Sequence, residues 1–467
     1  MGHKRRLRAW IAAALLAAPV VAAGEDAGVR RRLEELERKQ EAVSEEIREL
    51  RQQLGKPSEG ETEAARRQDI LAEEVRRLRE ALVIPETREL KSHYGLGPAA
   101  SKVYGIERGL SIGGYGEANY RAAVGDEGST RDEFDFIRFV LYFGYKYNDW
   151  IVLNSEIELE HAFTKSTVSS EAGEVALEFA TLDFLLHSAA NARVGLLLVP
   201  MGFINEIHEP PFYHGNVRPL VETDIIPSTW RANGFGLFGV PIAGLQYRTY
   251  GLTGLNAKGF RAANVRDARQ RGNREIAEDF AWVGRVDYAP LLGTLIGGSI
   301  YLGDSGQDQE FAGEKPGVFT RIFEGHAQFR MYGLEARALG AILEIDDADA
   351  LSRARSEGGT PEMPVTPETV GERMVGYYFE VAYDVLPLLV PDTTHYLAPW
   401  FRYSKVDTHD SVPSGFPRDP KRDREVIEVG LSYKPIPQVV FKLDYRNQDS
   451  DGGDLTDELR VGGGFVF

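Results

Sequence analysis

The sequence predicts an all-β fold, a transmembrane antiparallel β-barrel of about sixteen strands, preceded by an α-helical coiled coil. Three observations predict it. Apolar residues repeat every seven residues near the start of the chain, and then alternate with polar residues to its end. The links between the alternating segments switch between short and long. The chain therefore divides into a signal peptide over 1–23, a coiled-coil stalk and linker over 24–98, and a barrel over 99–467.

The composition excludes several classes of function. The chain has 467 residues, no cysteine, and a net charge of −17 from 54 basic and 71 acidic residues. The lack of cysteine excludes disulfide scaffolds and cysteine-ligated zinc or iron–sulfur sites. An acidic chain is a poor nucleic-acid binder, because such binding depends on neutralising phosphates. No apolar run is long enough for a membrane-spanning helix, which needs about 20 residues.

The first residues have the pattern of a secretory signal. Basic residues over 4–8 precede a short apolar run over 10–18, and small residues over 21–23 offer a cleavage point. The alternative is a membrane anchor, but the run is too short to cross a bilayer and Pro19 follows it. We therefore expect an exported protein.

A heptad follows the signal and predicts a coiled coil. The break over 55–60 separates it from a second run over 64–82, which Pro85 ends. A solvated single helix or a helical hairpin is the alternative, but a lone helix would leave the seam in water. The seam permits dimers or trimers. Its a positions are Leu33, Gln40, Ile47 and Leu54, and its d positions are Val29, Leu36, Val43 and Leu50.

Beyond about residue 105 the spacing of the apolar residues changes from a repeat of 3.5 residues to a repeat of two. In the segment 137–147, Ile137, Phe139 and Leu141 share one face, and polar or small residues take much of the other. Such alternation over about ten residues is typical of barrel strands with lipid outside and water inside, although a soluble β-sandwich also alternates. Similar segments recur at 151–160, 278–288, 318–330, 333–345, 372–385, 395–407, 424–434 and 437–446.

The links favour the barrel. Short links alternate with long ones, as they do between the two rims of an outer-membrane barrel. An even number of strands leaves both barrel ends on the short-turn rim, so the stalk is expected in the periplasm. Short links are expected at 148–149, 189–191, 240–243, 289–291, 331–332, 387–394 and 435–436. Long ones are expected at 123–131, 163–172, 202–230, 257–277, 303–317, 346–370, 408–422 and 450–456.

The segment 192–203 and the terminal Phe467, which closes an alternating strand, resemble bacterial outer-membrane porins. Within them the chain is similar to the phosphate-selective porin family, in which a coiled coil precedes a sixteen-stranded barrel. This resemblance implies a homotrimeric, water-filled pore narrowed by its third loop, in the outer membrane of a Gram-negative-type bacterium. Lipid and lipopolysaccharide would surround it. The chain departs from that family because residues 99–467 carry 35 basic and 53 acidic residues, whereas phosphate-selective members have basic linings.

Charged residues on the strands are candidates for the pore lining. A basic side chain facing lipid at mid-bilayer costs about 2–4 kcal/mol, so in a barrel these residues face inward. On a soluble protein they would form the solvent face instead. The glutamates at 156, 158 and 160 share one face of a predicted strand, and their negative charge would favour cations locally. The predicted set is Arg138, Lys146, Glu156, Glu158, Glu160, Arg285, Asp287, Glu380, Arg402, Lys442, Asp444 and Arg446.

The third long loop, 202–230, is the most distinctive link. Folded inward, its charges would form a constriction that sets ion preference; the alternative is an extracellular lid. The resemblance favours the inward fold. Its charged residues, with the next strand's first, are Glu206, His208, Glu209, His214, Arg218, Glu222, Asp224 and Arg231. Imidazole and carboxylate together suit zinc, but Glu206, His208, Glu209 and His214 have flexible loop spacing, so we expect no metal.

Three further motifs carry weaker functional signals. The glycines at 234, 236 and 239 match a dinucleotide fingerprint, but a second strand follows where that motif needs a helix. The acidic run 449–454 lacks the sixth-position glycine and the final glutamate of a calcium loop. A basic cluster in or beside the fourth long loop would attract anions or lipopolysaccharide phosphates. Its members are Arg261, Arg266, Arg269, Arg271 and Arg274.

These observations predict a porin that passes ions and small hydrophilic solutes by diffusion, with weak cation preference, no cofactor and no enzymatic step. An anion- or phosphate-selective channel is one alternative. The other is a structural tether, in which the stalk contacts the cell wall while the barrel anchors it in the outer membrane.

Overall fold

A computed structural model describes residues 90–124, 131–162, 173–357 and 368–467. The chain divides into two compact units, Met1–Glu86 and Thr87–Phe467. The signal peptide and the stalk heptads lie outside the described residues and remain predictions. The second unit is the barrel. Residues 90–98, the described part of the chain before the expected boundary at 99, fall within this unit, and the boundary itself stays a prediction.

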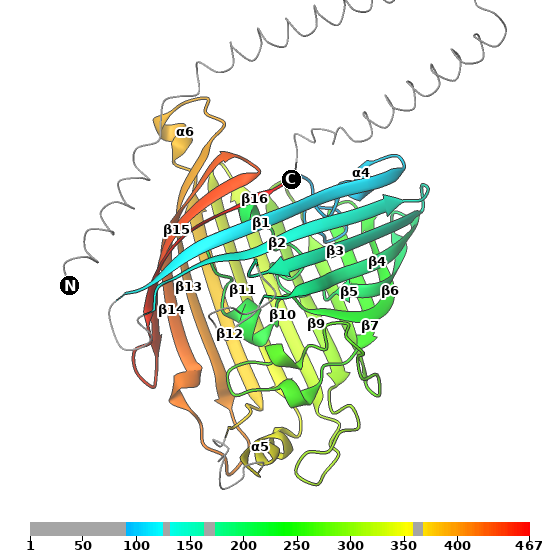
Figure 1. The fold of residues 1–467 in the computed structure, drawn as a ribbon, viewed down its shortest axis with the longest axis vertical. Coiled ribbons are helices and arrows are strands. Elements are labelled where there is room, and N and C mark those ends of the chain that lie inside the picture. The colour runs from blue at the N-terminus through cyan, green and yellow to red at the C-terminus, as the bar shows by residue number, and fades with distance from the viewer. Residues whose placement is uncertain (1–89, 125–130, 163–172, 358–367) are drawn as a thin grey trace, which may run out of the picture. The chain divides into compact units, whose positions relative to one another are not determined.

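The barrel is closed, and each strand pairs antiparallel with its neighbour in sequence, with β1 completing the ring against β16 (Figure 1). The predicted all-β barrel of sixteen strands is thereby confirmed. The strands are β1 (Gly109–Val124), β2 (Glu133–Lys146), β3 (Ile151–Glu160), β4 (Val175–His187), β5 (Ala190–Leu198), β6 (Arg231–Ile242), β7 (Leu245–Thr253), β8 (Phe280–Tyr288), β9 (Thr294–Asp304), β10 (Phe319–Met331), β11 (Leu334–Ile345), β12 (Arg373–Tyr383), β13 (Tyr396–Ser411), β14 (Asp423–Ile436), β15 (Val439–Ser450) and β16 (Asp457–Val466).

The two faces of the strands differ in chemistry, and β8 shows the difference. Phe280, Trp282 and Val286 are exposed on its outer face, whereas Arg285 and Asp287 are buried on its inner face. A soluble protein would place these two sets the other way round, because water outside would favour the charges. The reversed arrangement suits a barrel whose outer surface meets lipid.

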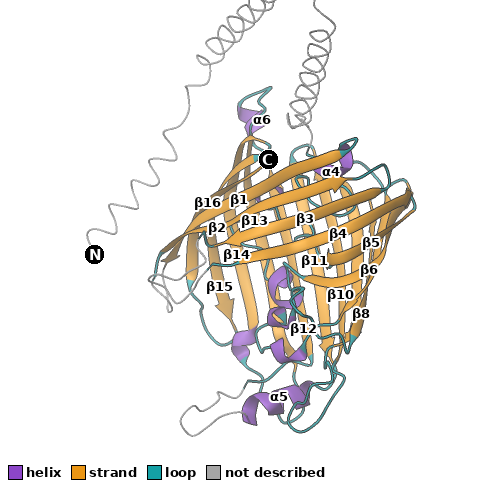
Figure 2. Cartoon of the chain, turned by 45° about the vertical axis from the view of Figure 1, so that its right-hand side comes forward, coloured by secondary structure: helices purple, strands orange, loops and turns teal. Residues whose placement is uncertain are grey.

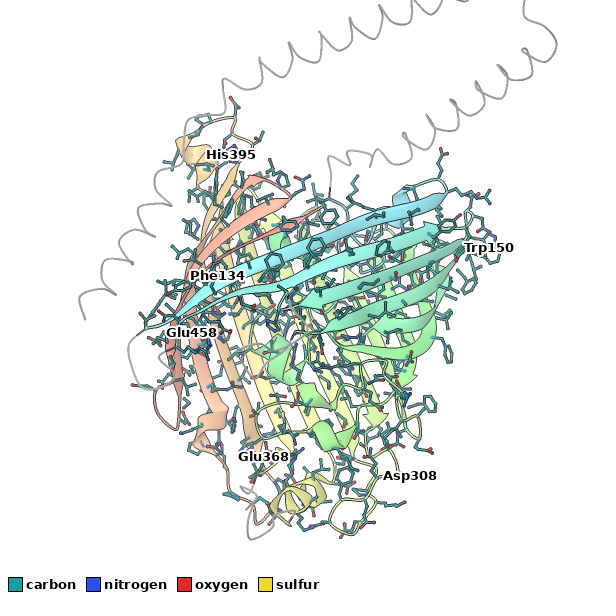
Figure 3. All side chains as sticks on the ribbon, in the orientation of Figure 1. Phe134, Trp150, Asp308, Glu368, His395 and Glu458 are labelled. Carbon is teal, nitrogen blue, oxygen red and sulfur yellow. The ribbon has the colours of Figure 1, made fainter. Side chains whose placement is uncertain are left out.

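The links alternate between short and long around the barrel. Residues 188–189, 243–244 and 332–333 form tight turns, whereas 199–230 and 254–279 are long. His395, in the link after β12, lies at one end of the barrel, and Asp308 and Glu368, in links after β9 and β11, lie at the other (Figure 3). The short and long links therefore occupy opposite rims.

Within the described residues, helices occur in the segment before β1 and in the links. The helices α5 (Ala348–Glu357) and α6 (Leu386–Leu389) lie at opposite ends of the barrel (Figure 2). Among the described residues, no helix has the length and apolar character needed to cross a membrane. The remaining helical elements are α4 (Lys102–Gly105), η1 (Pro210–Phe212), η2 (Val221–Ile225), η3 (Ala257–Gly259), η4 (Arg266–Ala268) and η5 (Pro420–Arg422).

The terminal residue takes part in closing the barrel. The backbone N–H of Phe467 donates to the Gly114 carbonyl at 2.9 Å, and the Gly114 N–H donates to the Phe467 carbonyl at 3.0 Å. The Phe467 ring stacks against Phe139 and Phe465. The last aromatic residue therefore extends the β1–β16 pairing and adds apolar area to the outer face.

Candidate functional site

The link between β5 and β6, here called loop 199–230, is tied together at its root by one asparagine. Asn205 Nδ2 donates to the carbonyl oxygens of Val199 and Trp230, at 2.7 and 2.9 Å. Its Oδ1 accepts from the Trp230 N–H at 2.7 Å. Asn205 is fully buried, so each of these bonds satisfies a group that water does not reach. The two ends of the loop are thereby held side by side.

The middle of loop 199–230 reaches a distant wall of the barrel. The backbone N–H and the side-chain amide of Asn216 both donate to Asp444 Oδ1 on β15, at 2.8 and 2.6 Å. Lys442 Nζ, also on β15, donates to the Gly215 carbonyl at 2.8 Å. Because β15 is remote from β5 and β6 around the ring, the loop crosses the interior of the barrel.

The charged residues expected on this loop contact several different strands. Most are buried; Arg218 and Asp224 are half-buried. Each contact joins a side chain to the inner wall, except that of Arg218 with Ser228, which lies within the loop. The contacts join Glu206 to Arg248 and Arg285, His208 to Glu156, His214 to Ser432, Arg218 to Ser228, Glu222 to Tyr378, Asp224 to Arg424, and Arg231, at the start of β6, to Glu178.

Eleven of the twelve charged strand residues, all except Glu160, have a side-chain ion pair or hydrogen bond with another described residue. Nine of the twelve are buried, and Arg138, Lys146 and Glu160 are half-buried. Arg402, for example, is fully buried and pairs with Glu380 at 2.6 Å and with Glu428 at 3.0 Å. Charges paired in this way attract passing ions less strongly than free charges would.

Two of these residues, Arg285 and Asp287, form a fully paired network with Glu324 and His326 on β10, which the sequence analysis did not name; the four are here called the β8–β10 cluster. Asp287 accepts from Arg285 Nε at 2.9 Å and contacts His326 Nε2 at 2.9 Å. His326 Nδ1 lies 2.6 Å from Glu324 Oε1, and Ser299 donates to the other oxygen of Glu324. None of the buried side-chain nitrogen or oxygen atoms in this cluster lacks a partner.

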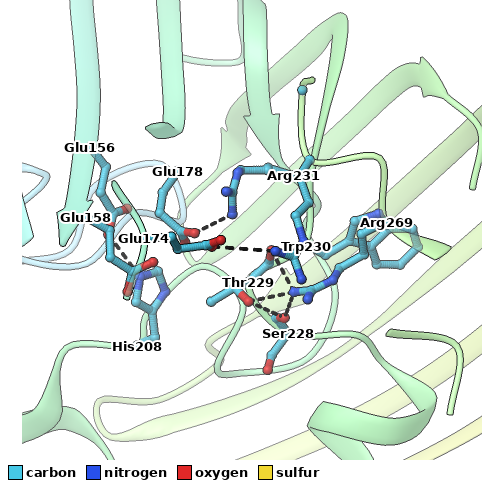
Figure 4. Close-up of polar contacts among 12 residues, drawn as sticks. Glu156, Glu158, Glu174, Glu178, His208, Ser228, Thr229, Trp230, Arg231 and Arg269 are labelled. Atoms are coloured by element: carbon cyan, nitrogen blue, oxygen red, sulfur yellow. Dashed lines mark hydrogen bonds and ion pairs between the residues drawn. The ribbon is translucent and has the colours of Figure 1, made fainter. Parts of the chain in front are cut away.

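A second set, here called the β3–β4 cluster, joins Glu156 on β3, Glu178 on β4 and His208 on loop 199–230 (Figure 4). His208 Nε2 lies 3.2 Å from Glu156 Oε1. Burial and the positive charge of Arg218 lower the pKa of the His208 imidazole to about 4. His208 is therefore neutral near pH 7 in this environment.

Four arginines inside the barrel have no carboxylate within ion-pair distance among the described residues. They are Arg218 on loop 199–230, Arg266 and Arg269 on the link after β7, and Arg337 on β11, which donates to Gln328 and to the Phe212 carbonyl. Arg266 and Arg269 donate to the backbone and side-chain oxygens of Ser228 and Thr229. Burial and the charge of Arg266 lower the pKa of the Arg269 guanidinium to about 8. These side chains hold the loop in place and leave positive charge unbalanced.

The segment 90–108 packs inside the short-turn end of the barrel. Tyr104 donates to Asp183 on β4 at 2.7 Å, and the Ala99 N–H donates to Glu209 Oε1 on loop 199–230 at 2.9 Å. Burial raises the pKa of the Glu209 carboxyl to about 8. No pattern in the sequence predicted this contact. The one residue that reflects it is Gly97, because an added Cβ there would lie 2.6 Å from the Glu209 carboxyl.

A cavity of about 310 Å³ lies between this segment, loop 199–230 and the wall. Its walls carry mixed charge, and it opens toward the turns after β6 and β8. The charged lining distinguishes it from a mainly apolar hollow over β7–β12. Its charged lining residues are Glu206, Arg248, Arg285, Asp287, Arg330 and Arg337.

The four loop residues weighed as zinc ligands do not come together. Glu206 pairs with Arg248, and His208 contacts Glu156. Glu209 accepts from Ala99, and His214 contacts Ser432. Different walls of the barrel hold these side chains, so that grouping forms no common site.

The weaker motifs are structural. The glycines at 234, 236 and 239 lie within β6, which β7 follows directly. The run 449–454 lies at the end of β15 and in the following link, and its residues are largely exposed. Of the other basic-cluster members, Arg261 lies 3.9 Å from Asp267 and Arg271 lies 3.5 Å from Glu174, both in exposed positions, and Arg274 is also surface-exposed.

The fold places the chain among sixteen-stranded barrels of the porin type. OmpF of Salmonella typhi is similar with a TM-score of 0.50 and 13% sequence identity, covering 77% of this chain and 98% of that one. The outer membrane channel DcaP of Acinetobacter baumannii has a TM-score of 0.49 and 13% identity, covering 77% and 97%. These likenesses concern the fold.

The chain belongs to the same family as an uncharacterized protein of Aquifex aeolicus. The two are 36% identical over 362 residues, which cover 77% of this chain and 80% of that protein. The sequence matches no described protein-family profile.

Proposed function

We propose that this protein is an outer-membrane channel through which ions and small hydrophilic solutes diffuse without a chemical step. The observation that carries the proposal is the closed ring of sixteen strands with exposed apolar side chains outside and charged side chains inside. Such a ring satisfies every backbone group within a bilayer and encloses a polar interior.

Loop 199–230 is the proposed constriction. It crosses the interior, and its contacts with β15 at one side and with Arg248 and Arg285 at the other narrow the space that remains. The cavity of about 310 Å³ on the short-turn side would form the vestibule below it. The mixed charges there would screen solutes by charge and size.

The channel is tested with purified full-length protein in planar lipid bilayers. We expect discrete conductance steps, and larger steps from a variant in which residues 203–229 are replaced by a short glycine–serine link. Far-UV circular dichroism confirms that the variant retains its strands. Absence of steps in both proteins would contradict the channel proposal, and equal steps would contradict the constriction.

Ion preference separates two versions of the proposal. The acidic composition of the barrel favours weak cation preference. The arginines Arg218, Arg266 and Arg269, however, are charges without a carboxylate partner among the described residues, and they favour the second candidate, an anion-selective channel. Reversal potentials in a KCl gradient distinguish them by sign, and Arg218→Gln should shift the potential toward cation preference if the arginines dominate.

The oligomeric state and the position of the stalk are also part of the proposed function. We propose a homotrimer with the stalk in the periplasm, and deletion of residues 24–86 removes the stalk while sparing the described barrel. A trimerising stalk predicts weaker trimers in this variant by analytical ultracentrifugation. A cell-wall tether instead predicts intact trimers and conductance, with a loosened cell envelope.

A further inference from the structure

We propose that Glu156, Glu178 and His208 bind one divalent transition-metal ion of the zinc type inside the barrel. One ligand atom from each residue lies within 4.8 Å of the others (Figure 4). The three residues are 0%, 2% and 2% exposed. They come from β3, β4 and loop 199–230, so the ion would join the loop to the wall. This site does not depend on the channel function.

The orientation of His208 is the first argument. Its Nδ1 lies 3.2 Å from the carbonyl oxygen of Asn205, which can only accept, so we assign the ring proton to Nδ1. The Nε2 lone pair then points at Glu156 Oε1, 3.2 Å away. Two acceptors at this distance need a proton or a cation between them. A backbone carbonyl on the second ring nitrogen is also the usual support of a metal-binding histidine.

Unpartnered carboxylate oxygens are the second argument. Glu156 Oε2 and Glu178 Oε2 are buried without a hydrogen-bond partner among the described residues. Glu158 lies against Glu178 and adds a third carboxylate. Arg138 pairs with Glu158, and Arg231 pairs with Glu178, so no arginine lies within ion-pair distance of Glu156 among the described residues, and Arg138, Arg218 and Arg231 offset its charge only at longer range. A buried cation would satisfy both free oxygens and that charge.

A local irregularity in the strands is the third argument. Glu156 pairs with Phe179, but the next residue, Ile157, pairs with Leu177, so Glu178 is an extra residue in β4. Because of this bulge, Glu178 and Phe179 are both buried although they are consecutive. In a regular strand one of them would face outward. Bulges commonly re-aim a side chain at a functional site, and here the bulge turns Glu178 toward His208.

The ligand types select the metal. One imidazole and two carboxylates suit zinc and similar ions, whereas calcium and magnesium prefer six or more oxygens. Ligands about 2.0–2.1 Å from a tetrahedral ion lie about 3.3 Å apart, close to the 3.2 Å between His208 Nε2 and Glu156 Oε1. The fourth position would be taken by Glu158 or by water.

The test uses tag-free full-length protein in detergent, stripped with a chelator, dialysed against 10 µM ZnCl₂ and then against metal-free buffer. We expect about one zinc per chain by inductively coupled plasma mass spectrometry, and at least a tenfold loss of retained zinc in His208→Ala and Glu178→Gln. The matched control is His187→Ala, an exposed histidine at the far end of β4, which should retain one zinc.

Cobalt provides a readout that does not depend on stoichiometry. Co²⁺ added to the stripped protein should give visible absorption bands of a low-coordinate site, and zinc should abolish them. Circular dichroism shows whether each variant keeps its strands, and Glu178→Gln preserves side-chain volume if His208→Ala does not fold. Zinc retention by the wild type no greater than by folded Glu178→Gln, or no cobalt bands in the wild type, would overturn the proposal.

Discussion

Two buried histidine–carboxylate clusters of this barrel, the β8–β10 cluster and the β3–β4 cluster, differ in how completely their charges are paired. In the β8–β10 cluster, His326 lies between two carboxylates, and Arg285 contributes a further positive charge. In the β3–β4 cluster, His208 has a carbonyl oxygen on one side and a carboxylate on the other, and two carboxylate oxygens have no partner among the described residues. The residue types are alike, but the first cluster is complete in itself and the second needs a further positive species.

Burial of similar carboxylate and imidazole groups therefore affects stability differently, according to whether positively charged partners are buried with them. A paired buried network resists removal of any member, because the remaining charges stay buried. An incompletely paired cluster gains from neutralisation or from a bound cation. The following predictions test this difference, from the largest expected effect to the smallest.

The largest effect is expected from Arg285→Met. This change leaves Asp287 and Glu206 in the interior without one of their positive partners, and loss of one partner from a buried network costs about 3–5 kcal/mol. Urea unfolding followed by tryptophan fluorescence in lipid vesicles measures the change. A loss below about 1 kcal/mol would mean that water reaches this cluster freely, and the contrast with the β3–β4 cluster would fail.

A smaller loss is expected from Glu324→Gln. The amide keeps the shape of the side chain but removes the negative charge beside His326 Nδ1. Hydrogen bonds to charged groups contribute about 1.5–3 kcal/mol, so the free energy of unfolding should fall by that amount. The same unfolding assay applies, and Ser299→Ala controls for loss of the neighbouring hydrogen bond alone.

The same substitution in the β3–β4 cluster, Glu156→Gln, should have the opposite sign. In chelator-treated protein its amide would donate to the free lone pair of His208 Nε2, replacing two opposed acceptors by a hydrogen bond. Stability should rise by about 0.5–1.5 kcal/mol. Equal destabilisation by Glu156→Gln and Glu324→Gln would show that the two clusters do not differ in pairing.

The last prediction concerns the pH dependence of stability rather than its value at one pH, and the group is Glu209, the neighbour of His208. Its folded pKa, about 8, lies above the usual range of a carboxyl, because burial disfavours the charged form. The folded state therefore binds the Glu209 proton more tightly than the unfolded state does. The contribution of this protonation to the free energy of unfolding is fully present below about pH 4.5, and it is lost progressively as pH rises to about 8. Wild-type unfolding midpoints should therefore fall between pH 5 and 8, and Glu209→Gln should flatten that fall. A rise with pH attributable to Glu209 would contradict the assignment.

The sequence alone determined the class of fold, a strand number of about sixteen, and the positions of nine strands, β2, β3, β8 and β10–β15. Lipid outside and polar groups inside impose alternation with period two on every strand, so the pattern can be seen in each segment separately. The order of short and long links follows from the same strands. The inward direction of Arg285, Asp287 and Arg402 could be predicted once the barrel was predicted, since in a barrel the outward direction places charge in lipid.

Only the tertiary structure decided which inward side chains meet. The pairing of loop 199–230 with β15, the position of the segment 90–108 and the partner of His208 depend on contacts between residues far apart in the chain, which no local period encodes. Glu178 shows this most clearly, because one extra residue in β4 reverses the side that simple alternation predicts. The sequence therefore determined a barrel with a charged interior, and the register of the strands and the path of one loop determined where that charge remains unpaired.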